Sequence, residues 1–156
     1  MAKEQVWDVV MLTEIRAEGE GVVQLGRDEE LAAIIHTDKA AILLRDEILK
    51  RWCEGGMKKK FGERVVSVKV NGVVLMLVYM PVWSVGRTEE IERVREVVVA
   101  QAGWSEREEV LVIGGDMNSH IGHDSARGST CGKFGLQTSS VAGDNFVEWL
   151  GENGRC

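Results

Sequence analysis

The chain has 156 residues, of which 44% are hydrophobic and 28% charged, and its formal net charge is −6. This length suits one folded domain with a core of its own. The acidic balance gives no support for nucleic-acid binding, because proteins that bind polyanions usually carry a basic surface. Acidic residues do suit a site for a divalent cation.

The sequence contains no signal for a membrane or a secretory route. No apolar run approaches the roughly 20 residues that a membrane-spanning helix needs, and the first residues lack the three regions of a signal peptide. Cys53, Cys131 and Cys156 are odd in number and form no CxxC pair, which favours reduced thiols over a disulfide framework. We therefore expect an intracellular protein, cytoplasmic or nuclear, with no membrane partner.

Apolar runs with β-branched residues predict most of the chain to be strands. The runs 6–14 and 73–81 are nearly continuous, so we expect both of their faces to be covered. The run 63–70 alternates and is joined to 73–81 by Asn71-Gly72, a strong signal for a two-residue hairpin. The segment 31–45 predicts two short strands joined at HTDK, 21–26 predicts a smaller strand, and 108–118 predicts another buried strand.

Three segments predict helices. The segment 88–103 begins at Thr88, an expected N-cap, and ends at Gly103, with apolar residues at helical spacing between them. The segments 142–154 and 46–56 are shorter candidates. A polar loop rich in Gly and Ser fills 122–144, and loops of this length are often functional. We expect a single α/β domain whose sheets are covered by a few helices.

Polar residues stand at the ends of three of the predicted strands. Glu14 ends the first, Tyr79 lies near the end of the second, and Asp116 and Asn118 end the third. If these ends lie side by side, the four side chains meet at one rim of the sheet. One carboxylate there can bind Mg²⁺, another can take a proton from water, and an amide and a phenol can stabilise phosphate oxygens. The alternative is that these residues only close turns.

The order LTE (12–14), VYMP (78–81) and GGDMNSHIG (114–122) resembles the endonuclease/exonuclease/phosphatase superfamily. The segments 19–44 and 132–154, the latter reading GKFGL…GDNFVEWLGENG, are similar to the endonuclease domains of non-LTR (LINE-type) retrotransposons and to craniofacial development protein-like sequences. The resemblance spans essentially the whole chain. It implies a two-sheet α/β sandwich and hydrolysis of a DNA phosphodiester with Mg²⁺ or Mn²⁺.

The resemblance also implies roles for single residues. Glu14 would be the metal ligand, Asp116 would activate the attacking water, Asn118 would orient Asp116 and contact the phosphate, and Tyr79 would hydrogen-bond that phosphate. Trp83 and Arg87 follow VYMP and are candidates for substrate binding, with packing and a surface role as their alternatives. The expected partners are DNA and, within a larger polyprotein, a reverse transcriptase.

The sequence departs from the family pattern at both ends. An asparagine motif should precede residue 1, and a strand with a second aspartate and a final SDH motif should follow residue 156. We therefore expect a partial domain, 1–156, without its N-terminal and C-terminal strands. His120, His123 and His36 are no evident substitutes for the SDH histidine, and a zinc site at SHIGH is a weaker alternative.

These observations predict a metal-dependent endonuclease as the parent activity, with this chain weakly active. Two other interpretations remain open. The chain could be a non-catalytic remnant of the fold, or it could descend from a phosphatase of the same superfamily that acts on a small phosphoester. The segment 132–154 favours the nuclease over the phosphatase.

Overall fold

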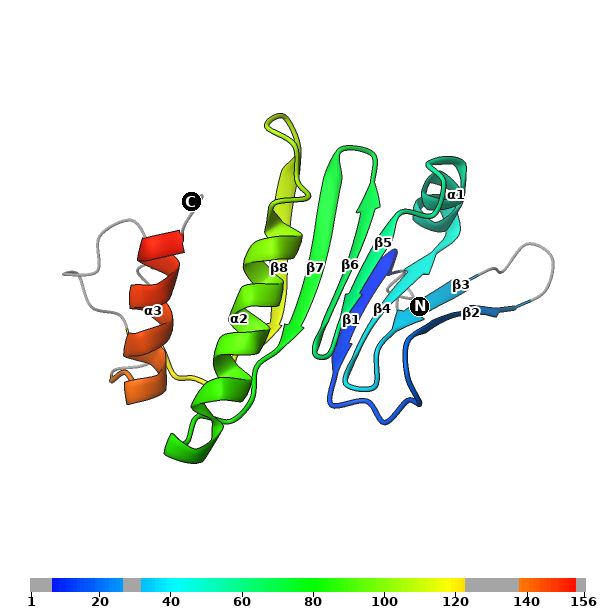
Figure 1. Cartoon of the computed structure of the whole chain (residues 1–156). Helices are drawn as coiled ribbons and strands as arrows, with labels where there is room; N and C mark the ends of the chain where they lie inside the picture. The colour runs from blue at the N-terminus through cyan, green and yellow to red at the C-terminus, as the bar shows by residue number, and fades with distance from the viewer. Residues whose placement is uncertain (1–6, 27–31, 123–137, 154–156) are drawn as a thin grey trace, which may run out of the picture. The chain divides into compact units, whose positions relative to one another are not determined.

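The computed structural model describes residues 7–26, 32–122 and 138–153. Figure 1 shows the helices and strands coloured along the chain. The chain divides into two compact units. The first unit comprises Met1–Tyr79 and Arg93–Asp116, and the second comprises Met80–Glu92 and Met117–Cys156. The described part is α/β, with two mostly antiparallel sheets that both belong to the first unit. None of the described helices has the length and apolarity to cross a membrane.

Sheet A is antiparallel, and its strands lie in the order β1-β4-β3-β2. Their bounds are β1 Val9–Thr13, β2 Gly21–Leu25, β3 Ala32–His36 and β4 Ala40–Arg45. The HTDK turn joins β3 to β4 because the Thr37 hydroxyl accepts hydrogen bonds from the backbone N–H groups of Lys39 at 3.2 Å and Ala40 at 3.1 Å. The two predicted strands within 31–45 are thus confirmed.

Sheet B has the order β5-β6-β7-β8, with the first three strands antiparallel and β8 parallel to β7. Their bounds are β5 Lys59–Gly62, β6 Val65–Val70, β7 Val73–Tyr79 and β8 Val110–Asp116. The predicted hairpin is confirmed, since Asn71 and Gly72 adopt φ values of 49° and 74°, as a tight turn between paired strands requires. The parallel pair needs a crossover, which contains α2 (Thr88–Ala102).

The core lies between the two sheets. Its buried side chains come from β3 and β4 on one side and from β6 and β7 on the other, and they include Ile35, Ile42, Leu44, Val66, Val68 and Leu77. The short helix α1 (Asp46–Glu54) adds Leu49 and Trp52 to this core. The indole N–H of Trp52 donates to the carbonyl of Lys58 at 2.9 Å, which satisfies its one polar group.

The second face of sheet B packs against the part of α2 that belongs to the first unit. Val94 and Val98 are buried there. The Ser67 hydroxyl of β6 donates to the Gln101 side-chain carbonyl at 2.5 Å, and both residues are almost fully buried. A polar pair in this apolar layer is tolerated because each member satisfies the other.

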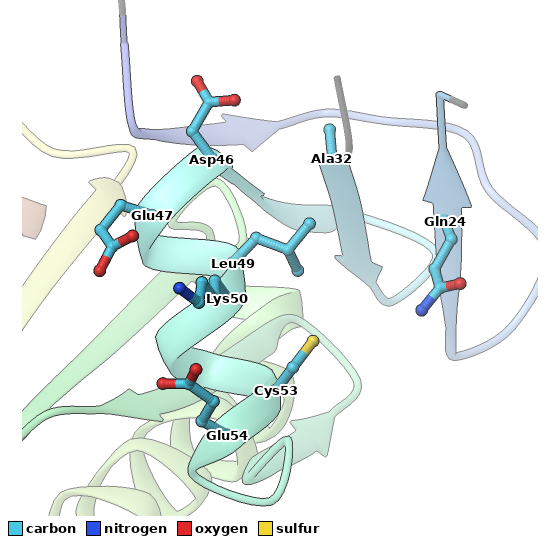
Figure 2. A pocket seen from close by; sticks show the side chains of 8 residues that line it. All are labelled: Gln24, Ala32, Asp46, Glu47, Leu49, Lys50, Cys53 and Glu54. Carbon is cyan, nitrogen blue, oxygen red and sulfur yellow. The ribbon is translucent and has the colours of Figure 1, made fainter. Parts of the chain in front are cut away.

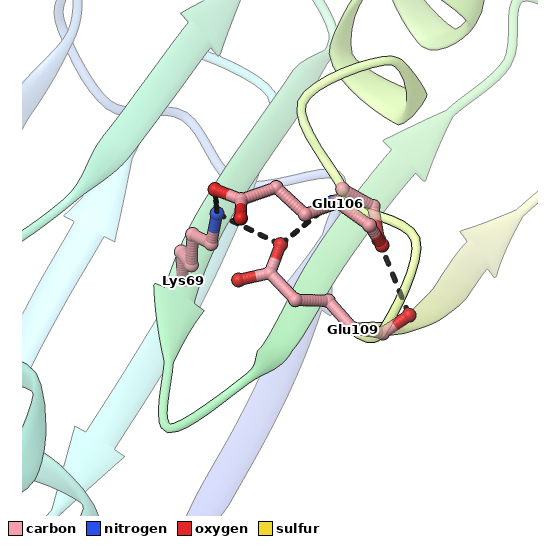
Figure 3. Close-up of polar contacts among 4 residues, drawn as sticks. Lys69, Glu106 and Glu109 are labelled. Atoms are coloured by element: carbon pink, nitrogen blue, oxygen red, sulfur yellow. Dashed lines mark hydrogen bonds and ion pairs between the residues drawn. The ribbon is translucent and has the colours of Figure 1, made fainter.

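An ion-pair cluster fixes the connection between α2 and β8 (Figure 3). Lys69 of β6 is 9% exposed, and its ammonium lies 2.7 Å from Glu109 and 3.2 Å from Glu106. Glu109 also accepts a hydrogen bond from the backbone N–H of Glu106 at 2.8 Å. This cluster therefore ties the residues that precede β8 to strand β6 of the same sheet.

The structure corrects the expected coverage of β1 and β8. Leu12 is 42% exposed, and Val110, Val112 and Ile113 are 58%, 43% and 40% exposed. The prediction that 108–118 forms a buried strand is wrong, because β8 lies at the edge of sheet B. The prediction that both faces of 6–14 are covered is wrong in the same way at Leu12. For 73–81 the prediction holds, since Val74, Met76, Leu77 and Val78 are at most 1% exposed.

Two local predictions also differ from the structure. The charge of three consecutive lysines at 58–60 suggests a solvated turn, yet Lys59 and Lys60 begin β5 and pair with Val68 and Ser67. Thr88 does not act as the expected N-cap acceptor, because its hydroxyl donates to the carbonyl of Val85 at 3.1 Å. The turn of 3-10 helix over Val85–Arg87 runs directly into α2 and leaves no separate cap position.

Candidate active site

Three residues predicted from strand ends lie together in the first unit. The Tyr79 hydroxyl donates to Oε1 of Glu14 at 3.3 Å. Tyr79 is the register partner of Asp116 across the parallel β7–β8 ladder. Glu14 directly follows β1, and Tyr79 and Asp116 end their own strands. Tyr79 therefore links the two carboxylate-bearing strand ends.

Small residues in β8 allow this arrangement. Strand β1 packs against β7 and β8, and a Cβ placed on Gly114 would lie 3.0 Å from the sulfur of Met11. Gly115 is more constrained, since its φ is 146° and a Cβ there would overlap the backbone carbonyl of Val78. Only glycine adopts this conformation without strain. The two glycines thus bring β8 close to its neighbours immediately before Asp116.

Glu14 has a left-handed backbone, with φ of 59°. Glutamate is rarely found there, since its Cβ is crowded in this region. Residues held in sparsely populated conformations cluster at functional sites, where the surrounding structure maintains them. The exposed Glu14 carboxylate is therefore positioned by its backbone as well as by Tyr79.

Arg64 is a neighbour of this site that the sequence did not indicate. Its guanidinium lies 5.2 Å from the centroid of the Tyr79 ring, and its carbonyl accepts the Tyr79 backbone N–H at 2.9 Å. A cation over an aromatic face is attracted by the ring. Arg64 lies in the turn before β6, where the sequence suggests a solvent-exposed arginine. Its contact with the Tyr79 ring is therefore visible only in the fold.

Asn118 belongs to the second unit. Its side-chain amide donates to the carbonyl of Met80 at 2.7 Å, and its φ is 45°, which asparagine tolerates well. Asn118 is thus tied to the residue that follows Tyr79 in the chain. Its convergence with Glu14 and Asp116 stays a prediction.

Ser140 holds the segment after Asn118 against helix α3 (Val141–Asn153). The Ser140 hydroxyl accepts hydrogen bonds from the backbone N–H groups of Gly143 at 3.0 Å and His120 at 3.1 Å. A Cβ on Gly143 would overlap the carbonyl of His120. Ser140 is the N-cap of α3. The serine pair before the predicted helix could have indicated it, but nothing in the sequence signalled the bond to His120.

The remaining predicted residues lie on the surface or outside the described residues. In the second unit, Trp83 is 40% exposed, and Arg87 ends the 3-10 turn, also exposed. His120 is exposed, and His123 lies outside the described residues, as do Cys131 and Cys156. Within the described ranges, no three His, Cys, Asp or Glu side chains are grouped closely enough to hold a metal ion by themselves.

A pocket of about 520 Å³ lies elsewhere in the first unit (Figure 2). It is lined by α1 and by residues of β2 and β3, among them Gln24, Ala32, Leu49 and Cys53. Cys53 is an exposed free thiol. None of the residues predicted to be functional lines this pocket, so it is separate from the candidate active site.

No protein-family model matches the chain, and no curated protein matches it either.

Proposed function

We propose that this chain carries the metal-binding and water-activating part of a Mg²⁺-dependent phosphodiester hydrolase. The substrate would be DNA, cut to leave a 3′-hydroxyl. The observation that carries the proposal is the link between Glu14 and Tyr79 at 3.3 Å, with Tyr79 beside Asp116 in the sheet. An interpretation as simple turn closure does not account for a strained glutamate bonded to a tyrosine from a different sheet.

The donors of the site fit a hard cation. Mg²⁺ is usually bound by one or two carboxylates, with waters and substrate phosphate completing its ligands. The Glu14 carboxylate is exposed and already oriented, so it would hold the ion, or Mn²⁺ in its place. When bound, the ion would neutralise charge on the phosphate.

The protein's own residues would supply the remaining chemistry. Asp116 would accept a proton from the attacking water. The oxygen of that water would bond to phosphorus as the bond to the 3′ oxygen breaks, and the departing 3′ oxygen would take a proton from a second water molecule. Tyr79 and Asn118 would donate hydrogen bonds to the phosphate, and Arg64 lies close enough to Tyr79 to favour an anionic substrate.

The specific fold family of the chain and its place in a larger polyprotein are part of the same proposal. Two packed sheets with these motifs in this order support a fold of the endonuclease/exonuclease/phosphatase type, in the lineage of retrotransposon endonucleases. Trp83 and Arg87 would contact DNA from the second unit. The natural partner would be a reverse transcriptase domain of the same polyprotein.

Nicking of supercoiled plasmid in Mg²⁺ tests the proposal. The 156-residue chain is compared with a longer protein that adds the family's asparagine motif before it and the family's SDH motif after it. We expect the short chain to nick barely above background, and the extended protein to nick readily. Members of a catalytic group fail together, so Asp116→Ala, Asn118→Ala and Glu14→Gln should each abolish nicking by the extended protein.

Glu18→Gln is the matched control for Glu14→Gln, because Glu18 is also exposed and lies four residues further along the chain. It should leave nicking unchanged. Nicking that survives Asp116→Ala would refute the proposed mechanism. Release of phosphate from a small monoester without nicking would favour the phosphatase interpretation, and an inactive extended protein would favour the non-catalytic one.

A further inference from the structure

Tyr79 lies between a cation and a carboxylate within the first unit. The Arg64 guanidinium lies 5.2 Å from the centroid of the Tyr79 ring, and the hydroxyl of the same ring donates to Oε1 of Glu14 at 3.3 Å. The three residues come from the turn before β6, the end of β7 and the segment after β1. Three distant segments of the chain therefore place a cation and an anion at one tyrosine side chain.

The backbone holds Arg64 next to Tyr79 independently of the arginine side chain. Val65 and Val78 are register partners at the end of the antiparallel β6–β7 ladder. Beyond them, the backbone N–H of Tyr79 donates to the carbonyl of Arg64 at 2.9 Å. Arg64 and Tyr79 are therefore the next neighbours across the two strands, and such neighbours place their side chains on the same face. A substitution at Arg64 can change the side chain without removing this backbone bond.

The surroundings of the pair strengthen the contact between the cation and the ring. Arg64 and Tyr79 are both half-buried, whereas Glu14 is exposed. A cation over an aromatic face is attracted more strongly where water is partly excluded. The field of the same cation stabilises negative charge on the phenol oxygen, because it acts over a short distance in a medium less polar than water. The hydroxyl of Tyr79 therefore becomes a stronger hydrogen-bond donor.

We propose that Arg64 is a positioning residue of the candidate active site, which holds the Tyr79 ring and strengthens the Tyr79 hydroxyl as a donor. Arg64 would act on Glu14 and on a bound phosphate only through Tyr79. The catalytic consequence rests on the proposed hydrolase function, in which Tyr79 donates to the phosphate. The action of Arg64 on the hydroxyl does not rest on that function and can be tested by itself.

Two other roles for Arg64 make different predictions. An arginine that contacts phosphate directly would retain its effect after the Tyr79 hydroxyl is removed. An arginine that only packs its aliphatic stem on the ring could be replaced by methionine without loss. A charge that acts through the hydroxyl requires both the cation and the hydroxyl.

The chain contains a single tyrosine, which allows a direct test. In the 156-residue chain labelled with carbon-13 at tyrosine Cζ, one NMR resonance reports Tyr79, and it moves downfield as the hydroxyl donates more strongly. Arg64→Met removes the charge and keeps an apolar stem, and Arg64→Gln removes the charge and keeps a polar side chain. We expect both variants to move the resonance upfield. Arg64→Lys keeps the charge and should retain most of the original position.

Arg107→Met is the matched control, because Arg107 is an exposed arginine of the same unit and the change in charge is identical. It should leave the Tyr79 resonance in place. Circular dichroism melting checks that each variant folds, and Arg64→Gln keeps the test valid if Arg64→Met does not fold. A resonance that neither uncharged variant moves would refute the inference. An equal movement in Arg64→Lys would show that the shape of the side chain matters rather than its charge, which also overturns it.

Nicking kinetics of the extended protein test the catalytic consequence. Arg64→Met should lower kcat about three- to thirtyfold, the range that one cation–ring contact supports, and should change KM less than kcat. Tyr79→Phe keeps the ring and removes the hydroxyl, so adding Arg64→Met to it should lower kcat by less than about twofold further. Arg107→Met should leave both constants unchanged.

The outcomes separate this inference from the proposed function. Equal losses with and without the Tyr79 hydroxyl, or a rise in KM with kcat unchanged, would make Arg64 a direct phosphate contact and overturn the inference. An extended protein that does not nick at all would overturn the proposed function alone. The Tyr79 resonance would then decide by itself whether Arg64 acts on the hydroxyl.

Discussion

Gly115 lies so close to Val78 that a Cβ on the glycine would overlap the valine's backbone carbonyl oxygen. The positive φ of 146° adds strain for any other residue. We predict that Gly115→Ala lowers the free energy of unfolding by about 2 kcal/mol or more, since both a strained backbone and a steric overlap must be relieved. Urea unfolding followed by circular dichroism measures the loss.

Gly151→Ala is the control for that change. Gly151 lies within α3, and a Cβ there meets nothing within 4 Å. Alanine in a helix stabilises by about 0.4–1 kcal/mol relative to glycine. A Gly115→Ala variant as stable as the unchanged chain would show that β8 can move away from β7 without cost.

Glu14 should dominate binding of divalent cations. Replacing its carboxylate by an amide removes the charge on which a hard cation depends, so Glu14→Gln should weaken Mn²⁺ binding at least about tenfold. Tyr79→Phe, which removes the hydrogen bond to Glu14, should weaken it less. Isothermal titration with Mn²⁺ measures both, with Glu18→Gln as the charge-matched control. Identical titrations for the unchanged chain and Glu14→Gln would mean that Glu14 holds no metal.

Ser67 and Gln101, which share a buried hydrogen bond, should contribute to stability as a pair. Gln101→Leu leaves the Ser67 hydroxyl buried without its 2.5 Å partner. A buried polar group deprived of its hydrogen bond costs about 1–3 kcal/mol. Ser67→Ala together with Gln101→Leu removes both polar groups, so the double variant should be more stable than Gln101→Leu alone. Urea unfolding of the three proteins decides this, and additive losses would contradict the pairing.

Stability should depend on pH through Lys69 and Glu109. The backbone N–H of Glu106, and then Lys69, lower the pKa of Glu109 below its ordinary 4.5. The hydrogen bond to Glu109 raises the pKa of Lys69 above its ordinary 10.5. A carboxyl with a lowered pKa stabilises the fold above its ordinary pKa and loses that effect as pH falls through the lowered value. The lysine's contribution is complete below 10.5 and is lost as pH rises through its raised value.

The loss of stability at acidic pH can be tested with two glutamates that are neighbours in the chain, Glu108 and Glu109. Between about pH 5 and pH 3 the unchanged chain should lose more stability than Glu109→Gln, which has no carboxyl to protonate at that position. Glu108→Gln makes the same change in charge at an exposed position and should follow the unchanged chain. Parallel pH profiles for all three proteins would rule out a role for Glu109.

The sequence predicts well those elements that local patterns determine. The Asn71-Gly72 hairpin follows from two residues that tolerate positive φ, and seven of the eight described strands lie within or overlap the predicted runs. Strand β5 was missed because Lys59 and Lys60 suggest solvent. Its formation depends on backbone pairing with β6 and on Phe61 packing against the core, neither of which is visible locally.

Coverage of the sheets could not be predicted in the same way. Apolar residues in β8 and on the outer face of sheet A have the composition of buried strands. An apolar composition indicates that a side chain favours burial. It does not indicate whether another segment of the chain packs over that side chain. Leu12 and Val112 therefore look buried in the sequence and are 42% and 43% exposed in the structure.

For the candidate site, the sequence indicates which residues to examine but not how they are held. The strand-end pattern selected Glu14, Tyr79 and Asp116, which the fold places in one unit. The need for glycine at 115 and the cation of Arg64 over the Tyr79 ring depend on contacts between distant segments. Asn118 lies in the other unit, so its role beside Asp116 is a prediction for the nicking assay.

The parallel pairing of β7 and β8 also determines the order in which the chain should fold. Hairpins such as β6–β7 close short loops, whereas β8 can pair only after the long crossover through α2 has brought it back to the sheet. Distant contacts form slowly because a large loss of chain entropy precedes them. We expect β8 to pair with β7 late in folding. The β6–β7 hairpin, with Tyr79 at its end, would then form before Asp116 reaches its position beside Tyr79.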